Sequence, residues 1–329
     1  IESWEKDYLQ SQLNGFDLMF FEEKVNSGSL RKISDINVLS SFVYSVIDDK
    51  VINSLKSLKY IATRSTGFDH IDLKACKKNK ILASSVPTYG ENTVAEHTFA
   101  LILALSRKIY PSLERTRKGD FSLEGLRGFD LKEKTLGVVG VGNIGKHVIR
   151  IAKGFGMRIL AYDIKKDRKL TKKMGFKYVA LEHLLKNSDI TTLHVPYNAS
   201  THHLINKRTL KLFKKNCYLI NTSRGGICDA TALLQGLKNK IFAGLGLDVL
   251  EEEGYIKEER ELLSLSFKKI SDLKIILENH VLINQPNVIV TPHNAFNSKE
   301  ALTRILDTTV ENIKSFSKNK PINLINPVK

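Results

Sequence analysis

The sequence contains no long apolar run and little cysteine, and both shortages narrow the class of protein. No stretch approaches the ~18–20 consecutive apolar residues that a membrane-spanning helix needs, so we expect no membrane segment. The first residues, IESWEKDYLQ, are polar and charged, which predicts that no signal peptide is present. The three cysteines share no metal-ligand spacing, so we expect no metal site and a reducing compartment, the cytoplasm.

Acidic residues are also in short supply, because 51 Lys and Arg stand against only 35 Asp and Glu, for a net charge of +16. Such an excess can indicate a nucleic-acid partner. Here the lysines are scattered in short runs such as KKNK and KKDRK, without a basic helix or interleaved aromatic residues. We therefore expect a solvated basic surface and no nucleic-acid partner, although the charge can attract anionic substrates.

Alternating strands and helices are expected through the middle of the chain, about 105–295. Short apolar runs rich in β-branched residues are typical of buried parallel strands, and helical patterns separate several of them. This alternation predicts a parallel sheet covered by helices on both faces. The expected strands are 135–140, 158–163, 189–196, 217–223, 243–249 and 287–292, and a helix at 229–240 has Asp229 as its expected N-cap.

A second, looser α/β block is expected in the first hundred residues. Its strand candidates are 16–21, 37–43, 58–64 and 81–86. The long apolar helix expected at 93–109 could bridge two domains, and the pattern at 299–316 predicts an amphipathic helix near the C-terminus. With 329 residues the chain is long enough for two domains.

A glycine-rich turn, Gly140-Val-Gly142-Asn-Ile-Gly145, follows one expected strand and opens a helix. In that context the motif predicts dinucleotide binding, with the pyrophosphate at the helix N-terminus. Asp163 ends the next strand, where a carboxylate can accept hydrogen bonds from ribose hydroxyls and repel a 2′-phosphate, which favours NAD over NADP. A purely structural turn, or a methyltransferase with a similar loop, is the alternative.

Three further polar residues, Arg224, Glu253 and His293, fall at or just after expected strand ends. Reduction of a carbonyl group needs such a set. A protonated histidine can donate the proton, a carboxylate bonded to it favours the charged form, and an arginine can hold a substrate carboxylate. Gly225 and Gly226 would let the arginine loop approach the ligand. Each residue alone is typical of an ordinary surface, and chemistry does not choose among the three consecutive glutamates at 251–253.

The other histidines have weaker functional interpretations. We expect His194 to line a cofactor cleft without donating a proton. His97 lies on the expected bridging helix, where packing is the default interpretation, and the adjacent His202 and His203 do not suit a shared metal site.

The chain resembles the D-isomer-specific 2-hydroxyacid dehydrogenases over nearly its whole length. Three regions carry the resemblance: GVVGVGNIGKHVIRIAKGFGMRILAYD, CYLINTSRGGICDATALLQGLKNKIFAGLGLDVLEEE and VIVTPHNAF. The family's acid lies five residues after the aspartate of the LDV strand, which implies Glu253 as the partner of His293. The resemblance also implies two Rossmann/flavodoxin-like domains with parallel sheets, with the cofactor domain inserted in the substrate domain.

The resemblance implies domain limits and further site residues. We expect the N-terminal part of the substrate domain at 1–98, apparently with its first strand truncated, the NAD-binding domain at 99–296, and a return to the substrate domain at 297–329. The implied cofactor-binding residues are Gly140, Gly142, Asn143, Ile144, Gly145, Asp163, Val195, Pro196, Thr201, Thr222, Ser223, Arg224 and Asp248. The implied substrate-binding residues are Thr66, Gly67, Tyr89, Arg224 and Phe296.

Within the family, VPTYGENTVAEH and FSLEGLRGFDL are similar to bacterial D-lactate dehydrogenases. This similarity implies NAD-dependent reduction of pyruvate to D-lactate by a cytoplasmic homodimer. A dehydrogenase for another D-2-hydroxyacid, with hydroxypyruvate or phenylpyruvate as the oxoacid, is the first alternative. A non-catalytic NAD-sensing binding protein on the same scaffold is the second.

Overall fold

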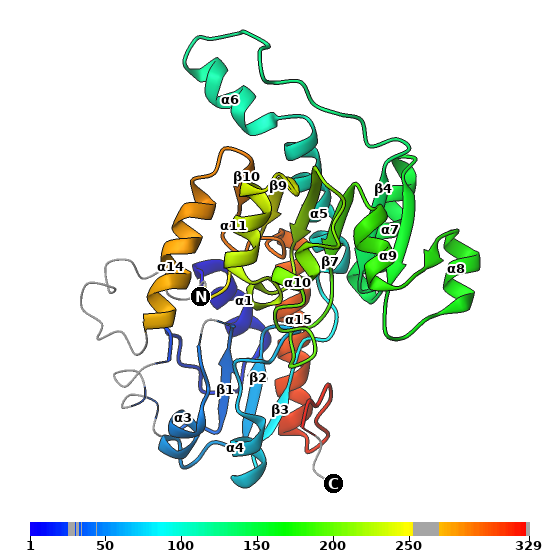
Figure 1. The fold of residues 1–329 in the computed structure, drawn as a ribbon. Helices are drawn as coiled ribbons and strands as arrows, with labels where there is room; N and C mark the ends of the chain where they lie inside the picture. Colours follow the sequence, from blue (N-terminus) through cyan, green and yellow to red (C-terminus); the bar gives the residue numbers. More distant parts are fainter. Residues whose placement is uncertain (26–29, 31–32, 34, 44, 253–269, 327–329) are drawn as a thin grey trace. The chain divides into compact units, whose positions relative to one another are not determined.

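The computed structural model describes residues 1–25, 30, 33, 35–43, 45–252 and 270–326. The chain divides into two compact units. The smaller comprises Ile1–Tyr89 with Asn297–Lys329, and the larger is Gly90–Phe296. Each is built on a parallel sheet with helices beside it, which confirms the expected α/β fold class (Figure 1).

The smaller unit has a three-stranded parallel sheet in the order β1-β2-β3. Ile61 and Ala62 of the central strand are fully buried, because helices or loops cover both faces. Asp48 and Asp72 accept hydrogen bonds from the first backbone N–H groups of α3 and α4 and so begin these helices. The elements are α1 (Ser3–Gln12), β1 (Val38–Ser41), α3 (Asp49–Ser54), β2 (Tyr60–Thr63), α4 (Leu73–Lys78), β3 (Leu82–Ser84) and α15 (Lys299–Ser317).

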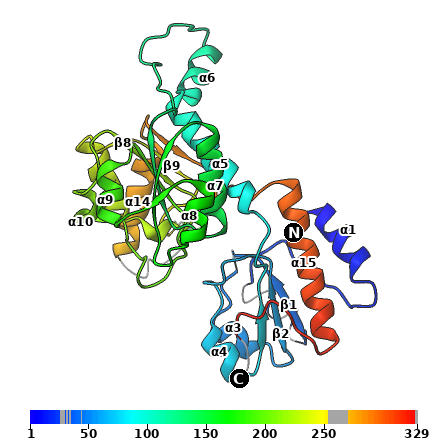
Figure 2. The same cartoon turned by 90° about the vertical axis from the view of Figure 1, so that its right-hand side faces the viewer.

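Helix α15, from the far end of the chain, completes the smaller unit. Figure 2 shows it beside α1, and both helices contribute to one apolar cluster with β2. The Phe316 ring stacks on the buried Tyr60 ring with centroids 4.2 Å apart. Asn312, also buried, donates to the Ser85 carbonyl oxygen at 3.0 Å. The amphipathic pattern at 299–316 therefore forms a helix that belongs to the first part of the chain.

The strand expected at 16–21 is wrong. The segment alternates as a strand would, since Leu18 and Phe20 pack against an apolar cluster while Met19 is exposed. It is not assigned to a sheet, because it makes no ladder with a neighbouring strand. Alternation reports a half-buried extended chain, and only a hydrogen-bonded neighbour makes that chain a strand.

The larger unit has a seven-stranded parallel sheet in the order β10-β9-β8-β7-β4-β5-β6. Its strands are β4 (Thr135–Val139), β5 (Arg158–Tyr162), β6 (Lys177–Tyr178), β7 (Ile190–Leu193), β8 (Cys217–Asn221), β9 (Phe242–Leu247) and β10 (Val288–Val290). Its helices are α5 (Glu91–Ser106), α6 (Ile109–Arg117), α7 (Asn143–Gly154), α8 (Arg168–Met174), α9 (Leu181–Asn187), α10 (Lys207–Leu210), η1 (Gly225–Ile227), α11 (Ala230–Lys238) and α14 (Ile270–Ile283).

Both faces of this sheet are buried, as its apolar strands require. Successive strand residues point to opposite faces, so Val138 and Ile220 join a cluster with α5 and α7, while Val139 and Leu219 join one with α9 and α11. Asp229 caps α11 by accepting from the backbone N–H of Thr231 at 2.9 Å, which confirms the expected N-cap. Helix α5 contacts α7, β8 and β9 and so lies wholly within this unit.

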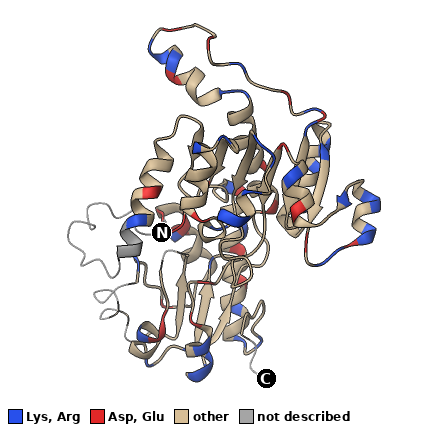
Figure 3. Ribbon diagram, viewed as in Figure 1, with Lys and Arg blue, Asp and Glu red and all other residues tan. Residues whose placement is uncertain are grey.

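Basic residues are spread over many elements of both units, and α8 alone carries four of them (Figure 3). Among the described residues, no helix combines the length and apolarity needed to cross a membrane.

Candidate active site

Six neighbouring strands of the larger sheet end level with one another. Their last paired residues form one line across the sheet, because each is the register partner of the next. The carboxyl ends of parallel strands form the crevice in which α/β sheets bind ligands, so the segments that follow these strands meet along one edge. The line runs through Tyr162, Val139, Leu193, Asn221, Leu247 and Val290.

The glycine turn after β4 has room on one side only. A Cβ at Gly140, where φ is +95°, would lie 2.6 Å from the carbonyl oxygen of His194, and a Cβ at Gly145 would lie 2.1 Å from that of Gly140. A Cβ at Gly142 would meet nothing within 4 Å. Among the described residues no side chain caps the N-terminus of α7, which begins beside this open space. The turn therefore fits the pyrophosphate of a dinucleotide, held by the first N–H groups of the helix.

Asp163, directly after β5, faces this turn. Its Oδ2 accepts a hydrogen bond from the backbone N–H of Val141 at 2.7 Å, and its Oδ1 accepts from that of Lys165 at 2.8 Å. A carboxylate oxygen has lone pairs for further bonds, so ribose hydroxyls beside the turn can also be bound.

His194 follows β7 and lies against the glycine turn. Its Nε2 is 2.9 Å from the Thr192 hydroxyl, while its buried Nδ1 has no partner among the described residues. Burial lowers the pKa of His194 to about 3, so the ring is neutral at neutral pH and unsuited to donate a proton. This state fits the cleft-lining role expected for it, because a bound ligand can satisfy the unpaired nitrogen.

Asn221, the last residue of β8, holds the turn that presents Arg224. Its Oδ1 accepts from the backbone N–H and the hydroxyl of Ser223, at 3.1 and 3.0 Å, and its Nδ2 donates to the Arg224 carbonyl oxygen at 2.9 Å. The guanidinium of Arg224 is half-buried and donates to the Ser223 carbonyl oxygen at 2.9 Å. A permanent cation therefore lies at the sheet edge on a turn fixed by a buried amide.

Close contacts within the protein require the two glycines after Arg224. A Cβ at Gly225 would lie 2.0 Å from the carbonyl oxygen of Leu250, and a Cβ at Gly226 would lie 2.8 Å from the ring of Tyr197. The loop is therefore wedged between two neighbouring segments of the protein, and these contacts alone exclude larger residues.

Asp248, directly after β9, shapes the turn that carries His293. Its Oδ1 accepts from the Asn294 backbone N–H at 2.8 Å and from the Thr291 hydroxyl, and its Oδ2 accepts from the Ala295 backbone N–H at 2.9 Å. The backbone N–H of His293 donates to the Asp248 carbonyl oxygen at 2.8 Å. His293 itself has φ of +52°, an uncommon left-handed conformation for a residue with a Cβ. The carboxylate thus holds the turn that aims the histidine.

His97 belongs to the same network. Its Nε2 lies 3.0 Å from the Thr291 hydroxyl and 3.4 Å from Asp248 Oδ1. Burial alone would raise the pKa of Asp248, but the bonds from His97, Thr291 and two backbone N–H groups outweigh it and hold that pKa below its usual range. The packing role expected for His97 is therefore incomplete, because its ring also binds the carboxylate that positions the His293 turn.

The remaining cofactor candidates also follow strands of this edge or begin α7. Thr222 is buried, with its hydroxyl 3.0 Å from that of Thr98 on α5. Thr201 closes the loop after β7 by donating to the Pro196 carbonyl oxygen at 2.6 Å. The exposed Asn143 and half-buried Ile144 are the first residues of α7, while Val195 and Ser223 are half-buried after β7 and β8.

The substrate candidates are divided between the units. Phe296 lies near His293, with ring centroids 6.4 Å apart and ring planes nearly perpendicular. Thr66, Gly67 and Tyr89 lie in the smaller unit, not on this sheet edge. There the Thr66 hydroxyl donates to the Val86 carbonyl oxygen at 2.7 Å. Glu253 lies outside the described residues, so its proposed partnership with His293 stays a prediction.

The sequence pattern missed Asn221, Thr291 and the role of His97. Thr291 and His97 act through contacts between distant segments. Asn221 bonds to its near neighbours Ser223 and Arg224, and its position at the end of a strand was the signal that could have found it. Within the described ranges, no group of three or more His, Cys, Asp or Glu residues could hold a metal ion. The edge combines a dinucleotide turn, an arginine and a histidine, which suits hydride transfer to a carbonyl group beside a carboxylate.

Known proteins are similar to this chain in sequence and in structure. A family model described as D-isomer specific 2-hydroxyacid dehydrogenase, NAD binding domain, matches residues 99–295. The chain is 38% identical over 312 residues to a 2-hydroxyacid dehydrogenase homolog of Zymomonas mobilis, covering 93% of this chain and 91% of that protein. It is 35% identical over 328 residues to D-lactate dehydrogenase of Escherichia coli, covering 97% and 95%. The structure of Aquifex aeolicus D-lactate dehydrogenase complexed with NAD and lactic acid matches with a TM-score of 0.90 and 36% identity, covering 100% of this chain and 98% of that one.

Proposed function

Since the chain belongs to the D-isomer-specific 2-hydroxyacid dehydrogenase family, we propose that it reduces pyruvate to D-lactate with NADH. The family makes it an NAD-dependent oxidoreductase. The observation that carries the proposal is the shared sheet edge, where the Arg224 turn, the His293 turn and the glycine turn all follow strands that end on one line.

Each residue of this edge has a distinct task in the reaction. The planar guanidinium of Arg224 binds the substrate carboxylate with two parallel hydrogen bonds and polarises the adjacent carbonyl group. His293 donates a proton to the carbonyl oxygen, and Glu253 stabilises the charged imidazolium before that transfer. NADH, when bound, supplies the hydride that the carbonyl carbon accepts. The glycine turn holds its pyrophosphate, and Asp163 binds its ribose.

Pyruvate is the proposed oxoacid because an aromatic side chain lies beside the proposed proton donor. The Phe296 ring lies 6.4 Å from the His293 ring, centroid to centroid, and we infer that it leaves room for a methyl group and not for a larger substituent. The sequence similarity to D-lactate dehydrogenases supports the same choice. Hydroxypyruvate and phenylpyruvate are the competing substrates, because they carry the same carboxylate and carbonyl groups.

The loss of NADH absorbance with a panel of 2-oxoacids tests this proposal. We expect the highest kcat/KM with pyruvate, and chiral chromatography should identify the product as D-lactate. A higher kcat/KM with phenylpyruvate or hydroxypyruvate would reassign the substrate. Absence of NADH oxidation with every oxoacid would contradict the proposed reaction and favour a non-catalytic role in NAD sensing.

We also propose that the protein is a homodimer in the cytoplasm. Helix α6 and the loop after it project from the larger unit (Figures 1 and 2) and expose large apolar side chains, with Phe121 78% and Leu123 83% accessible. Arg115 orders this loop by donating to the carbonyl oxygens of Ser122 and Glu124, at 2.9 and 2.7 Å. An ordered loop that exposes large apolar side chains is typical of a surface that another protein chain covers. Light scattering should give twice the chain mass, and Leu123→Ser should lower it.

The cytoplasmic location rests on the thiols. Cys76, Cys217 and Cys228 are free and buried, which suits a reducing compartment.

A further inference from the structure

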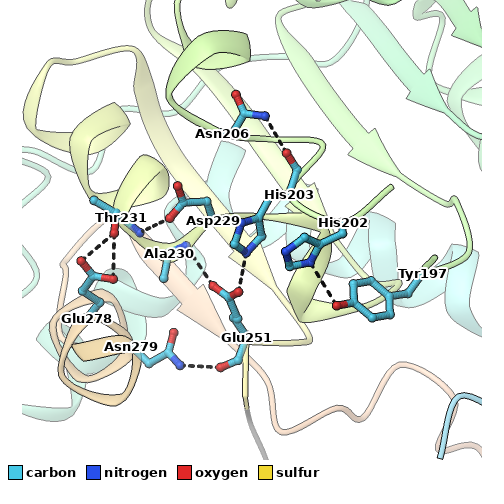
Figure 4. A network of polar contacts seen from close by, with 10 residues as sticks. All are labelled: Tyr197, His202, His203, Asn206, Asp229, Ala230, Thr231, Glu251, Glu278 and Asn279. Carbon is cyan, nitrogen blue, oxygen red and sulfur yellow. Dashed lines mark hydrogen bonds and ion pairs between the residues drawn. The ribbon is translucent and has the colours of Figure 1, made fainter. Parts of the chain in front are cut away.

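Glu251 lies between the end of β9 and Glu253, and three separate elements hold it (Figure 4). Its carboxylate is bonded to Nε2 of His203, and its Oε2 lies 3.4 Å from the backbone N–H of Ala230 at the start of α11. Its carbonyl oxygen accepts from Nδ2 of Asn279 on α14 at 2.7 Å. Only 10% of the side chain is exposed. A carboxylate that is buried and bonded in this way is part of the folded structure, and it does not belong to a solvated stretch of acidic residues.

His203, the partner of Glu251, is also held by several contacts. Its φ of +46° is left-handed, its backbone N–H donates to the Gly226 carbonyl oxygen at 2.9 Å, and its own carbonyl accepts from Nδ2 of Asn206 at 2.7 Å. The ring stacks on that of His202 with centroids 3.9 Å apart, and Nδ1 of His202 lies 3.0 Å from the Tyr197 hydroxyl. Figure 4 shows the His203 ring directed toward the Glu251 side chain and the His202 ring toward Tyr197.

The turn that presents Arg224 lies between these two partners. On one side, Gly226 accepts the backbone hydrogen bond of His203. On the other, Gly225 rests so closely on the backbone of Leu250 and Glu251 that a Cβ there would lie 2.5 Å from the Glu251 nitrogen. The bond between His203 and Glu251 therefore closes a ring around the turn.

We propose that His203 and Glu251 form a positioning pair for the reaction. The pair fixes the turn that carries Arg224, so one bond between distant segments sets the place of the group that binds the substrate carboxylate. The inference rests on the proposed function for its kinetic consequences. Loss of the pair loosens the grip of Arg224 on the substrate carboxylate, while the glycine turn, which follows β4 and is separated from β8 by β7, keeps its geometry.

Truncation of either partner should therefore affect the oxoacid more than the cofactor. We expect Glu251→Ala and His203→Ala each to raise KM for pyruvate and lower kcat/KM on the order of 10-fold, since a misplacement of about 1 Å can cost up to ~100-fold. The double variant should be no worse than the more impaired single variant, because both remove the same bond. The dissociation constant of NADH should stay near that of the unmodified protein.

A conservative variant and a matched control separate positioning from general damage. The amide of Glu251→Gln can still accept from the Ala230 N–H and donate to a ring nitrogen of His203. The charge-assisted bond becomes a neutral one, so we expect kcat/KM to stay within about threefold of that of the unmodified protein. Glu278→Gln removes a nearby carboxylate that accepts from the Thr231 hydroxyl at 2.8 Å and does not contact His203. This control should leave KM for pyruvate unchanged.

Hydrogen–deuterium exchange of residues 224–228 gives a readout that does not depend on turnover. Exchange there should rise in Glu251→Ala and not in Glu278→Gln. The proposal is overturned if this exchange is unchanged, if KM for pyruvate is unchanged in both alanine variants, or if their losses are additive. If the unmodified protein reduces no 2-oxoacid, the proposed function fails by itself, and the exchange experiment alone then decides whether the pair holds the turn.

Discussion

Replacement of Asp248 by asparagine should disconnect the turn that carries His293. The side chain is only 1% exposed, and each of its oxygens accepts a backbone N–H of this turn. The asparagine amide has one oxygen, so its NH₂ group must face one of those two N–H donors. Because Oδ1 accepts from both Thr291 and Asn294, the amide oxygen should take that position and leave the NH₂ group facing the N–H of Ala295. A buried N–H without an acceptor costs about 1–3 kcal/mol, and the remaining bonds lose their charge assistance.

We therefore expect Asp248→Asn to lower the free energy of unfolding by roughly 2–4 kcal/mol. Release of the left-handed conformation at His293 should lower kcat/KM for pyruvate on the order of 10- to 100-fold, because the proton donor is no longer aimed. Urea denaturation and steady-state kinetics measure the two effects. Thr291→Ser keeps the hydroxyl that donates to the carboxylate and serves as the control, with near-native values for both.

The pH dependence gives a further check on this prediction. The pKa of Asp248 is lower in the folded protein than in the unfolded chain, so its stabilisation is fully present above the unfolded value of about 3.9 and is lost as the pH falls through the folded value. The difference in unfolding free energy between the two proteins should be constant from pH 7 to about 5 and shrink below about pH 4. A variant with native stability and native kcat/KM would refute the role given to this carboxylate.

Three other predictions follow from the same edge of the sheet. Asp163→Ala should relax the preference for NADH over NADPH by removing repulsion of the 2′-phosphate, and equal kcat/KM with both cofactors in the unmodified protein would contradict this. Glu253→Gln should shift the pH–rate profile of pyruvate reduction to lower pH, because the imidazolium loses a stabilising charge, whereas Glu252→Gln should leave the profile in place; the reverse result would move the assignment by one residue. Since the pKa of His194 is lowered to about 3, its neutral form stabilises the fold above about pH 6.5 and this contribution is lost as the pH falls. His194→Asn should therefore reduce the loss of stability between pH 6.5 and 4.5, by less than about 1.4 kcal/mol per pH unit, and an unchanged slope in thermal denaturation would contradict the cause.

The elements of the larger sheet could be predicted because their local pattern and their burial agree. The run that became β4 is apolar on both faces, and the glycines that follow it are required by contacts as close as 2.1 Å within the same turn. The turn, the next strand and Asp163 lie within one βαβ unit, so a short stretch of sequence carries the pattern that predicts them.

The residues that could not be predicted depend on long-range neighbours. Residues 16–21 alternate like a strand, but a strand also needs a paired neighbour, and the sequence does not say which segment lies beside it. The bond between His203 and Glu251 joins residues that are 48 apart in the chain, so neither side chain signals the other. The same holds for His97 and Asp248, whose partnership depends on the packing of α5 beside β9.

Arginine 224 tests the central claim most directly, because the claim is that this edge of the sheet binds and reduces a 2-oxoacid. Arg224→Lys keeps the positive charge and loses the planar fork that binds a carboxylate with two bonds. The measurement is kcat/KM for pyruvate, from the loss of NADH absorbance, together with the dissociation constant of NADH in both proteins. We predict a loss in kcat/KM on the order of 100-fold or more, about 2.7 kcal/mol of transition-state stabilisation, with nearly unchanged NADH binding. Near-native turnover of pyruvate by the lysine variant would contradict the account.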